Sequence, residues 1–296
     1  MMKKVKINES LMHILKARMK QKLGISSNQN SLKIVEEGKK DGVSFLKLDN
    51  GMIFFHEFTK KPLNEVYSRH VYSHYEIDKK PHSLYGIHRN HTDNLLSLKV
   101  DETIRNDLFK KMPVKYGDVV LELGAFYGFG SMKLSKLVGD NGKVISVEAD
   151  KTNFEILKKN ISENNISNII PINKGIWNTK GNLTFFQESN QRNSLVDDLL
   201  ENVEKQNSIE VDTVDNILSD LNIDHVDFIS MEINAAEVNG LKGMKKTLSK
   251  NNIRLVCAGW YEFEGRPEWV SIKEILEEYG FSVYVGVQNR VFAIKQ

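Results

Sequence analysis

The sequence predicts an α/β fold with a mostly parallel sheet, helices on both faces and an antiparallel last strand. From Asp118 onward, short apolar runs alternate with helix-patterned segments, which is the order of strand–helix–strand units. The chain then finishes with two apolar runs, 281–287 and 291–295, separated by Gln288-Asn289-Arg290. Two strands joined by so short a turn are expected to run antiparallel.

The residues before this sheet have a different pattern. The first 23 residues hold seven lysines and arginines against one acid and predict a basic amphipathic helix. Residues 45–48 and 52–55 then predict a strand pair joined by an Asn50-Gly51 turn. We therefore expect residues 1–108 to form an α+β cap that recognises the substrate, and residues 109–296 to form the sheet domain.

The most informative segment runs from Val119 to Gly130, where an apolar run typical of a buried strand ends in an acid and a glycine-spaced turn. Helical spacing begins at Ser131. Glycine tolerates positive φ and has no Cβ, so glycines at this spacing let the backbone turn sharply and approach a ligand closely. The segment indicates a nucleotide-type cofactor at the carboxyl end of the strand.

Two acids indicate which cofactor this is. Glu122 stands two positions before the first glycine, where a carboxylate would repel the phosphates of a dinucleotide but attract the ammonium group of S-adenosyl-L-methionine. Glu148 ends the next predicted strand, where a carboxylate can accept hydrogen bonds from both ribose hydroxyls. Short-chain dehydrogenases share the glycine spacing, but their Tyr-x-x-x-Lys pair does not occur after Gly130. The two acids favour a cationic, phosphate-free nucleoside.

The elements that follow continue the alternation. Asp150 or Thr152 is expected to cap a helix, and a third strand follows at 169–173. The segment 174–177 then passes the place expected for the adenine, and 182–186 predicts an added β-ribbon.

Three blocks between Gly117 and Leu248 resemble the FkbM-type methyltransferase family. They are the 121–130 turn, the 147–150 strand end with Asn153 and Asn160, and the pair of segments 211–215 and 228–237. The resemblance implies a Rossmann-like class I methyltransferase with a seven-stranded sheet, S-adenosyl-L-methionine as the cofactor and O-methylation as the reaction. The family pattern in the last block is Lys-x-Asp-x-Glu-Gly-x-Glu. This chain keeps only its final acid, Glu237, and departs from it at Ser230, Glu232, Asn234 and Ala235.

Residues expected around the cofactor come from three segments. The turn and the acid before it would shape the methionine and ribose side, the end of the second strand would hold the ribose, and the segment after the third strand would border the adenine. The expected cofactor-binding residues are Glu122, Gly124, Ala125, Phe126, Tyr127, Gly128, Glu148, Ala149, Lys174, Gly175 and Ile176.

Candidates for catalysis lie in two places. Glu232 and Asn234 have period-2 spacing at the end of the fourth strand, so we expect both side chains on one face, one as the base and the other as its orienting partner. His70 and His74 are four residues apart and would share a helix face, from which a histidine base could reach in from the cap. No metal is expected, because no cysteine or compact carboxylate cluster completes a ligand set. The aromatic and acidic segment 261–264 either contacts the acceptor or forms an ordinary polar loop.

The amino-acid composition limits which kinds of function we expect. A net charge of +2 indicates no strong preference for polyanions. The single cysteine, Cys257, fits a reducing cytoplasm, and no apolar run approaches the roughly 20 residues of a membrane span. We therefore expect a cytoplasmic enzyme that methylates a hydroxyl of a small molecule or sugar. Two alternatives stay open: an RNA-modifying methyltransferase that grips phosphates with its basic N-terminus, and a catalytically inactive cofactor-binding protein.

Overall fold

The computed structural model describes residues 34–57, 111–188, 192–196, 205–286 and 289–296. All of these residues fall within one unit, Lys33–Gln296. The predicted basic helix, the histidine-bearing stretch with His70 and His74, and the expected boundary between residues 108 and 109 lie outside the described residues.

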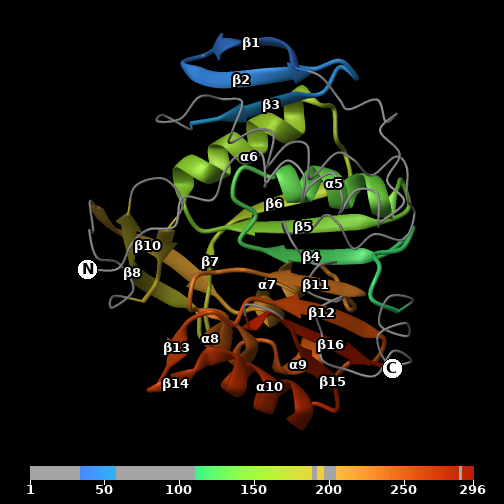
Figure 1. Ribbon diagram of the computed structural model, residues 1–296, viewed down its shortest axis with the longest axis vertical. Helices are drawn as coiled ribbons and strands as arrows, with labels where there is room; N and C mark the ends of the chain where they lie inside the picture. Colours follow the sequence, from blue (N-terminus) through green and yellow to red (C-terminus); the bar gives the residue numbers. More distant parts are fainter. Residues whose placement is uncertain (1–33, 58–110, 189–191, 197–204, 287–288) are drawn as a thin grey trace, which may run out of the picture. The chain divides into compact units, whose positions relative to one another are not determined.

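The largest sheet has seven strands in the order β15-β16-β12-β11-β4-β5-β6 (Figure 1). Neighbouring strands are parallel except around β16, which runs antiparallel to both β12 and β15. This confirms the mostly parallel sheet with an antiparallel last strand. The strands are β4 (Val119–Leu123), β5 (Lys143–Glu148), β6 (Ile169–Asn173), β11 (Phe228–Met231), β12 (Ile253–Cys257), β15 (Ser282–Val285) and β16 (Val291–Lys295).

A row of aliphatic side chains runs across the middle of this sheet. Leu255, Ile229, Leu121 and Ile145 are register partners on β12, β11, β4 and β5, and each is 0% exposed. Central parallel strands are covered on both faces, which explains why their sequences are continuous apolar runs.

Six helices are present among the described residues, and two of their ends follow from local sequence. Asp150 caps α6 by accepting a hydrogen bond from the Asn153 amide at 2.8 Å, as predicted. The helix α10 stops just before Gly280, whose φ of +83° suits glycine. The helices are α5 (Phe129–Val138), α6 (Lys151–Glu163), α7 (Val214–Asp220), α8 (Glu237–Lys242), α9 (Lys245–Ser249) and α10 (Glu268–Glu278).

Three smaller sheets accompany the main one (Figure 1). The predicted hairpin is confirmed as β2 (Val43–Leu48) and β3 (Ile53–His56), and a third strand that we did not predict, β1 (Ile34–Lys40), pairs with β2. The predicted ribbon is part of a sheet with the order β7-β10-β8-β9. The remaining strands are β7 (Gly175–Ile176), β8 (Gly181–Glu188), β9 (Arg192–Ser194), β10 (Lys205–Asp212), β13 (Glu262–Phe263) and β14 (Arg266–Pro267).

Among the helices of the described ranges, none combines the length and the apolar character that a bilayer crossing requires.

Candidate active site

The glycine turn between β4 and α5, residues 124–128, is a tight loop with three left-handed residues. Gly124, Phe126 and Gly128 have φ values of +88°, +53° and +80°. A Cβ on Gly124 would lie 2.0 Å from the carbonyl oxygen of Glu232, and one on Gly128 would lie 2.2 Å from Leu157. Both glycines are therefore required by the packing of the loop as well as by its backbone conformation.

Most amide groups of this loop are engaged within the protein. The N–H groups of Gly124 and Ala125 donate to the carbonyl oxygen of Val147 at 2.9 and 3.0 Å, and that of Gly128 donates to Ala125 at 2.8 Å. The Phe126 N–H donates to the Glu148 carboxylate at 2.8 Å. A phosphate-binding loop instead points such donors at its ligand. The loop is thus poorly equipped to bind a diphosphate.

Glu148 lies at the carboxyl end of β5, beside this loop. Besides Phe126, its carboxylate accepts hydrogen bonds from the Asp150 amide at 3.0 Å and from Asn153 Nδ2 at 3.4 Å. Burial raises the pKa of Glu148 to about 7, against the opposing effect of these three donors. Glu148 is 8% exposed, and the carbonyl oxygen of Ala149 after it accepts a hydrogen bond from Asn173.

Glu122 lies underneath the loop. Its carboxylate accepts hydrogen bonds from the hydroxyls of Ser131 on α5 and Ser146 on β5, the latter at 3.3 Å. Burial raises the pKa of Glu122 to about 7, although both serines favour the charged form, and the charge of Glu148 raises it further. With 3% exposure, Glu122 joins β4 to its neighbours and contributes its charge to the loop from below.

Lys174, Gly175 and Ile176 connect the main sheet to the sheet that contains β10. Lys174 Nζ lies 2.9 Å from Asp212 and 3.0 Å from Glu210, and the hydrogen bond that the ammonium group donates to Asp212 raises the pKa of this lysine. Gly175 and Ile176 are buried and pair with the end of β10. The ammonium group of Lys174 is thus held by two acids of β10.

The turn after β11 corrects one expectation. Period-2 spacing placed Glu232 and Asn234 on one face of a strand, but β11 ends at Met231. Asn234 and Ala235 have φ values of +53° and +69°, so the alternation of side chains stops here. Glu232 forms an ion pair with Arg290 at 3.4 Å. Asn234 Oδ1 instead accepts a hydrogen bond from the Tyr261 hydroxyl at 3.2 Å.

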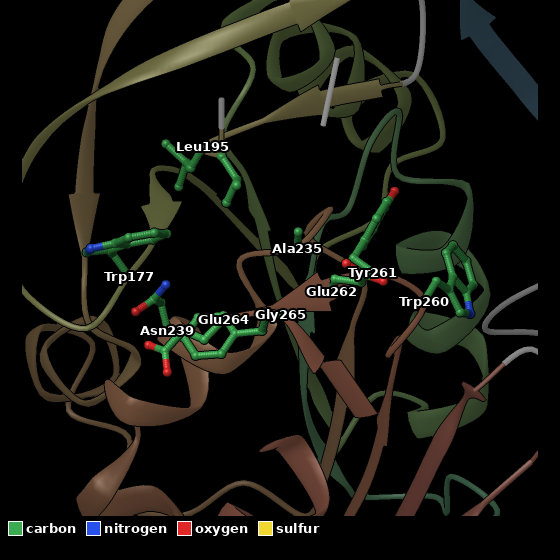
Figure 2. A pocket seen from close by; sticks show the side chains of 11 residues that line it. Trp177, Leu195, Ala235, Asn239, Trp260, Tyr261, Glu262, Glu264 and Gly265 are labelled. Atoms are coloured by element: carbon green, nitrogen blue, oxygen red, sulfur yellow. The ribbon is translucent and has the colours of Figure 1, made fainter. Parts of the chain in front are cut away.

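A pocket of about 900 Å³ opens beside this turn (Figure 2). Trp177 and Asn239 lie on one side of it, Tyr261 and Trp260 lie on the other, and Ala235 lies between them. The sequence had indicated 261–264 as a candidate rim and had placed the segment that ends at Trp177 beside the expected adenine, but it gave no signal that these residues line one pocket. We call this the aromatic pocket; its lining residues are Trp177, Leu195, Val196, Ala235, Asn239, Trp260, Tyr261, Glu262, Phe263, Glu264 and Gly265.

A buried charged group next to the pocket was not found from the sequence. Glu237 and Glu268, the first residues of α8 and α10, are both 0% exposed. Burial raises the pKa of each carboxyl, and the two titrate together. Arg290 is 5% exposed and lies over the Trp260 ring at 4.9 Å. Of Glu237, Glu268 and Arg290, only Glu237 was indicated by the sequence, because it is the acid that keeps the family pattern in the segment 228–237.

Part of the predicted site cannot be placed. His70 and His74 lie outside the described residues. Among the residues that are described, no group of three or more histidine, cysteine, aspartate and glutamate side chains has the arrangement of a metal site.

Known proteins are similar to this chain over part of its length. A curated relative, demethylmenaquinone methyltransferase of Lactobacillus johnsonii, is 31% identical over 101 residues, which are 33% of this chain and 41% of that protein. The crystal structure of methyltransferase FkbM from Methylobacillus flagellatus aligns with a TM-score of 0.45 at 14% identity, covering 69% of this chain and 59% of that one. Aeropyrum pernix fibrillarin with bound S-adenosyl-L-methionine aligns with a TM-score of 0.43 at 15% identity, covering 88% of this chain and 98% of that one.

The family assignment rests on a longer match. Residues 122–283, more than half of the 296 in the chain, match the model of the methyltransferase FkbM domain. This range begins at the acid before the glycine turn and ends within β15. Of the seven-stranded sheet it contains β5, β6, β11 and β12 whole and parts of β4 and β15, but not β16. The chain belongs to the FkbM methyltransferase family and has the Rossmann-like class I methyltransferase fold.

Proposed function

We propose that this protein is an S-adenosyl-L-methionine-dependent methyltransferase that methylates a hydroxyl group of a small molecule or sugar bound in the aromatic pocket. The observation that carries the cofactor assignment is that the amides of Gly124, Ala125, Phe126 and Gly128 are hydrogen-bonded within the protein. A dinucleotide would find few N–H donors for its diphosphate there, and it would meet the carboxylates of Glu122 and Glu148.

The chemistry of the surrounding residues fits a cationic nucleoside. Glu148 stands at the strand end where a carboxylate can accept hydrogen bonds from ribose hydroxyls. Glu122 acts from beneath the loop, through its charge and through the serines that it binds. Gly175 and Ile176 border the adenine side with their backbone and apolar atoms. We assign no ligand contact to the ammonium group of Lys174, because Asp212 and Glu210 hold it.

The lining of the aromatic pocket supports a neutral acceptor over a nucleic acid. Among the described residues that line it, four are aromatic, two are glutamates, and none is a lysine or an arginine. Aromatic faces pack well against the apolar faces of small rings, and glutamate oxygens accept hydrogen bonds from hydroxyls. Phosphates would be repelled by Glu262 and Glu264. This charge pattern supports the proposal of a small neutral acceptor over RNA.

When bound, the cofactor supplies a methyl group that its sulfonium already activates. The protein then has to align the acceptor oxygen and remove its proton. Tyr261 lines the pocket and donates to Asn234, so we propose that Asn234 orients Tyr261 toward the acceptor. Glu232 remains the candidate base, and the ion pair with Arg290 positions its carboxylate.

Two measurements test this function. Calorimetric titration should show binding of S-adenosylhomocysteine and no binding of NAD. Incubation with methyl-labelled S-adenosyl-L-methionine should then transfer label to a member of a panel of sugars and hydroxylated small molecules, but not to RNA. Uptake of NAD without S-adenosylhomocysteine would overturn the cofactor assignment. Labelled RNA, with binding that falls steeply with salt, would overturn the acceptor assignment. Cofactor binding without any product would favour the inactive alternative.

A further inference from the structure

Two asparagines, Asn160 in α6 and Asn164 at its C-cap, form hydrogen bonds with the backbone of β3. Asn160 Oδ1 accepts from the Phe55 amide at 2.6 Å, and its Nδ2 donates to the Phe55 carbonyl oxygen at 3.1 Å. One turn later, Asn164 does the same at Ile53, at 3.0 and 2.7 Å. Among the described strands, β3 pairs with β2 alone, and these side-chain amides bond the β3 backbone as a neighbouring strand's backbone would.

Only Asn160 also reaches the glycine turn. Its Nδ2 donates a second hydrogen bond to the carbonyl oxygen of Tyr127 at 2.8 Å. The side chain is 0% exposed, and Phe55 and Tyr127 are 0% and 3% exposed. One buried amide group therefore connects three parts of the fold: the N-terminal sheet, which consists of β1, β2 and β3, the helix α6, and the loop expected to hold the cofactor.

Other contacts join β3 to the same loop. The ring of Phe54 meets that of Phe129, the first residue of α5, edge-on with centroids 5.2 Å apart. A backbone hydrogen bond at Glu57, the residue after β3, reaches the Tyr127 phenol and opposes the rise that burial causes in its pKa. The glycine turn is thus supported from the side of β3 as well as by the main sheet.

The conformation of the loop makes this support important. Left-handed Phe126 is a costly conformation for a residue with a Cβ, and it persists only when neighbouring groups hold it. The Asn160 bond holds the next residue, Tyr127, by its carbonyl oxygen. Loss of both Nδ2 hydrogens would leave the carbonyls of Phe55 and Tyr127 buried without this donor.

We propose that Asn160 is a positioning residue for the cofactor loop, and that the β1–β3 sheet is part of the cofactor site through this amide. The proposal rests on the proposed function, because it takes residues 124–128 as the cofactor loop. It assigns the N-terminal sheet a task other than acceptor recognition. Loss of the bond would lower the fraction of molecules with a binding-competent loop, which weakens the apparent affinity for the cofactor.

Asn164, the residue that follows α6, provides a matched control. Asn160→Asp and Asn164→Asp each keep an acceptor for β3 and lose the donor to a β3 carbonyl. Each also loses a second bond from Nδ2, which goes to the loop carbonyl of Tyr127 in the case of Asn160 and to the Asn160 carbonyl within the helix end in the case of Asn164. Both variants should unfold more easily than the wild type. With S-adenosylhomocysteine as the probe, at a temperature where both are folded, Asn160→Asp should bind about 10-fold more weakly or worse. Asn164→Asp should stay within about 2-fold of the wild type, since its contact to the loop is indirect.

Hydrogen exchange of residues 124–130 in the unliganded protein provides a second readout. Exchange should become faster in Asn160→Asp and stay at the wild-type rate in Asn164→Asp. Equal affinity losses, or equal loop exchange, in the two variants would overturn the proposal. If Asn160→Asp does not fold, Asn160→Ser and Asn164→Ser make the same comparison. If the wild type binds no S-adenosylhomocysteine, the cofactor assignment fails, whereas the exchange rates still decide whether Asn160 holds the loop.

Discussion

The buried carboxyl group of Glu122 should make the stability of this protein depend on pH in a defined direction. Burial raises its pKa from 4.5 to about 7 in the folded state. Because the folded-state pKa is the higher one, the stability associated with this group is fully present below pH 4.5 and is lost as the pH rises through about 7. The variant Glu122→Gln has no titrating group there and should show no such loss from this position.

The magnitude follows from the two pKa values. Compared with a group that stays protonated, the shifted pKa of Glu122 lowers the free energy of unfolding by about 1 kcal/mol or slightly less at pH 5 and by about 3 kcal/mol at pH 8. The free energy of unfolding of Glu122→Gln, relative to the wild type, should therefore rise by about 2.5 kcal/mol between these two pH values. The amide adds its own cost beneath the loop, but that cost is the same at both pH values and cancels.

Urea unfolding of the wild type and Glu122→Gln at pH 5 and pH 8 measures this change. Buried acids that do not interact with Glu122 are present in both proteins and cancel in the difference, whereas Glu148, whose charge raises the pKa of Glu122, adds a coupling contribution to it. Glu155→Gln is the control, since Glu155 is 57% exposed and pairs with Lys158 at the surface. A difference between wild type and Glu122→Gln that is equal at both pH values would refute the reasoning.

Four further substitutions test other parts of the site. Gly124→Ala should destabilise the fold by about 2 kcal/mol or more in urea unfolding, since its Cβ would lie 2.0 Å from the Glu232 carbonyl oxygen at a φ of +88°; wild-type stability would contradict this. Glu148→Ala should weaken S-adenosylhomocysteine binding by about 1 to 3 kcal/mol in calorimetry, and an unchanged affinity would exclude the ribose role. Ala235→Gly should raise stability by about 1 kcal/mol, because Ala235 is left-handed at a φ of +69°; a lower melting temperature would count against that strain. Tyr261→Phe should lower kcat for methyl transfer without changing cofactor affinity, and an unchanged kcat would remove Tyr261 from the acceptor site.

The fold was predictable wherever burial dominates the sequence. The strands β4, β5 and β6 lie where their apolar runs predicted them, because both faces of the sheet are covered. The strand β1 was missed because its described side chains are exposed and mostly charged, so it has no apolar signal. The strand β12 ends at Cys257, although the following residues Ala258 and Trp260 are also apolar, so apolar character alone does not mark its end.

The site was predictable only where one short segment determines it. The glycine turn and its two acids follow from local spacing, and the structure brings them together. The prediction that Glu232 and Asn234 share one strand face was wrong, because a left-handed turn at Asn234 and Ala235 ends the period-2 alternation of side chains. The pairing of Arg290 with Trp260 joins residues from separate elements, so no local pattern could indicate it.

The acids at the carboxyl edge of the main sheet support the proposal that this site binds a cationic ligand. Glu122, Glu148 and Glu232 come from the ends of three neighbouring strands, β4, β5 and β11, and an ion pair with Arg290 partly neutralises Glu232. Burial disfavours the charged forms of Glu122 and Glu148, as their raised pKa values record. A bound cation would stabilise both charges, whereas a phosphate would add to their repulsion. Under the proposed function, the same two carboxylates that lower the stability of the free protein at high pH would favour a sulfonium nucleoside over a dinucleotide.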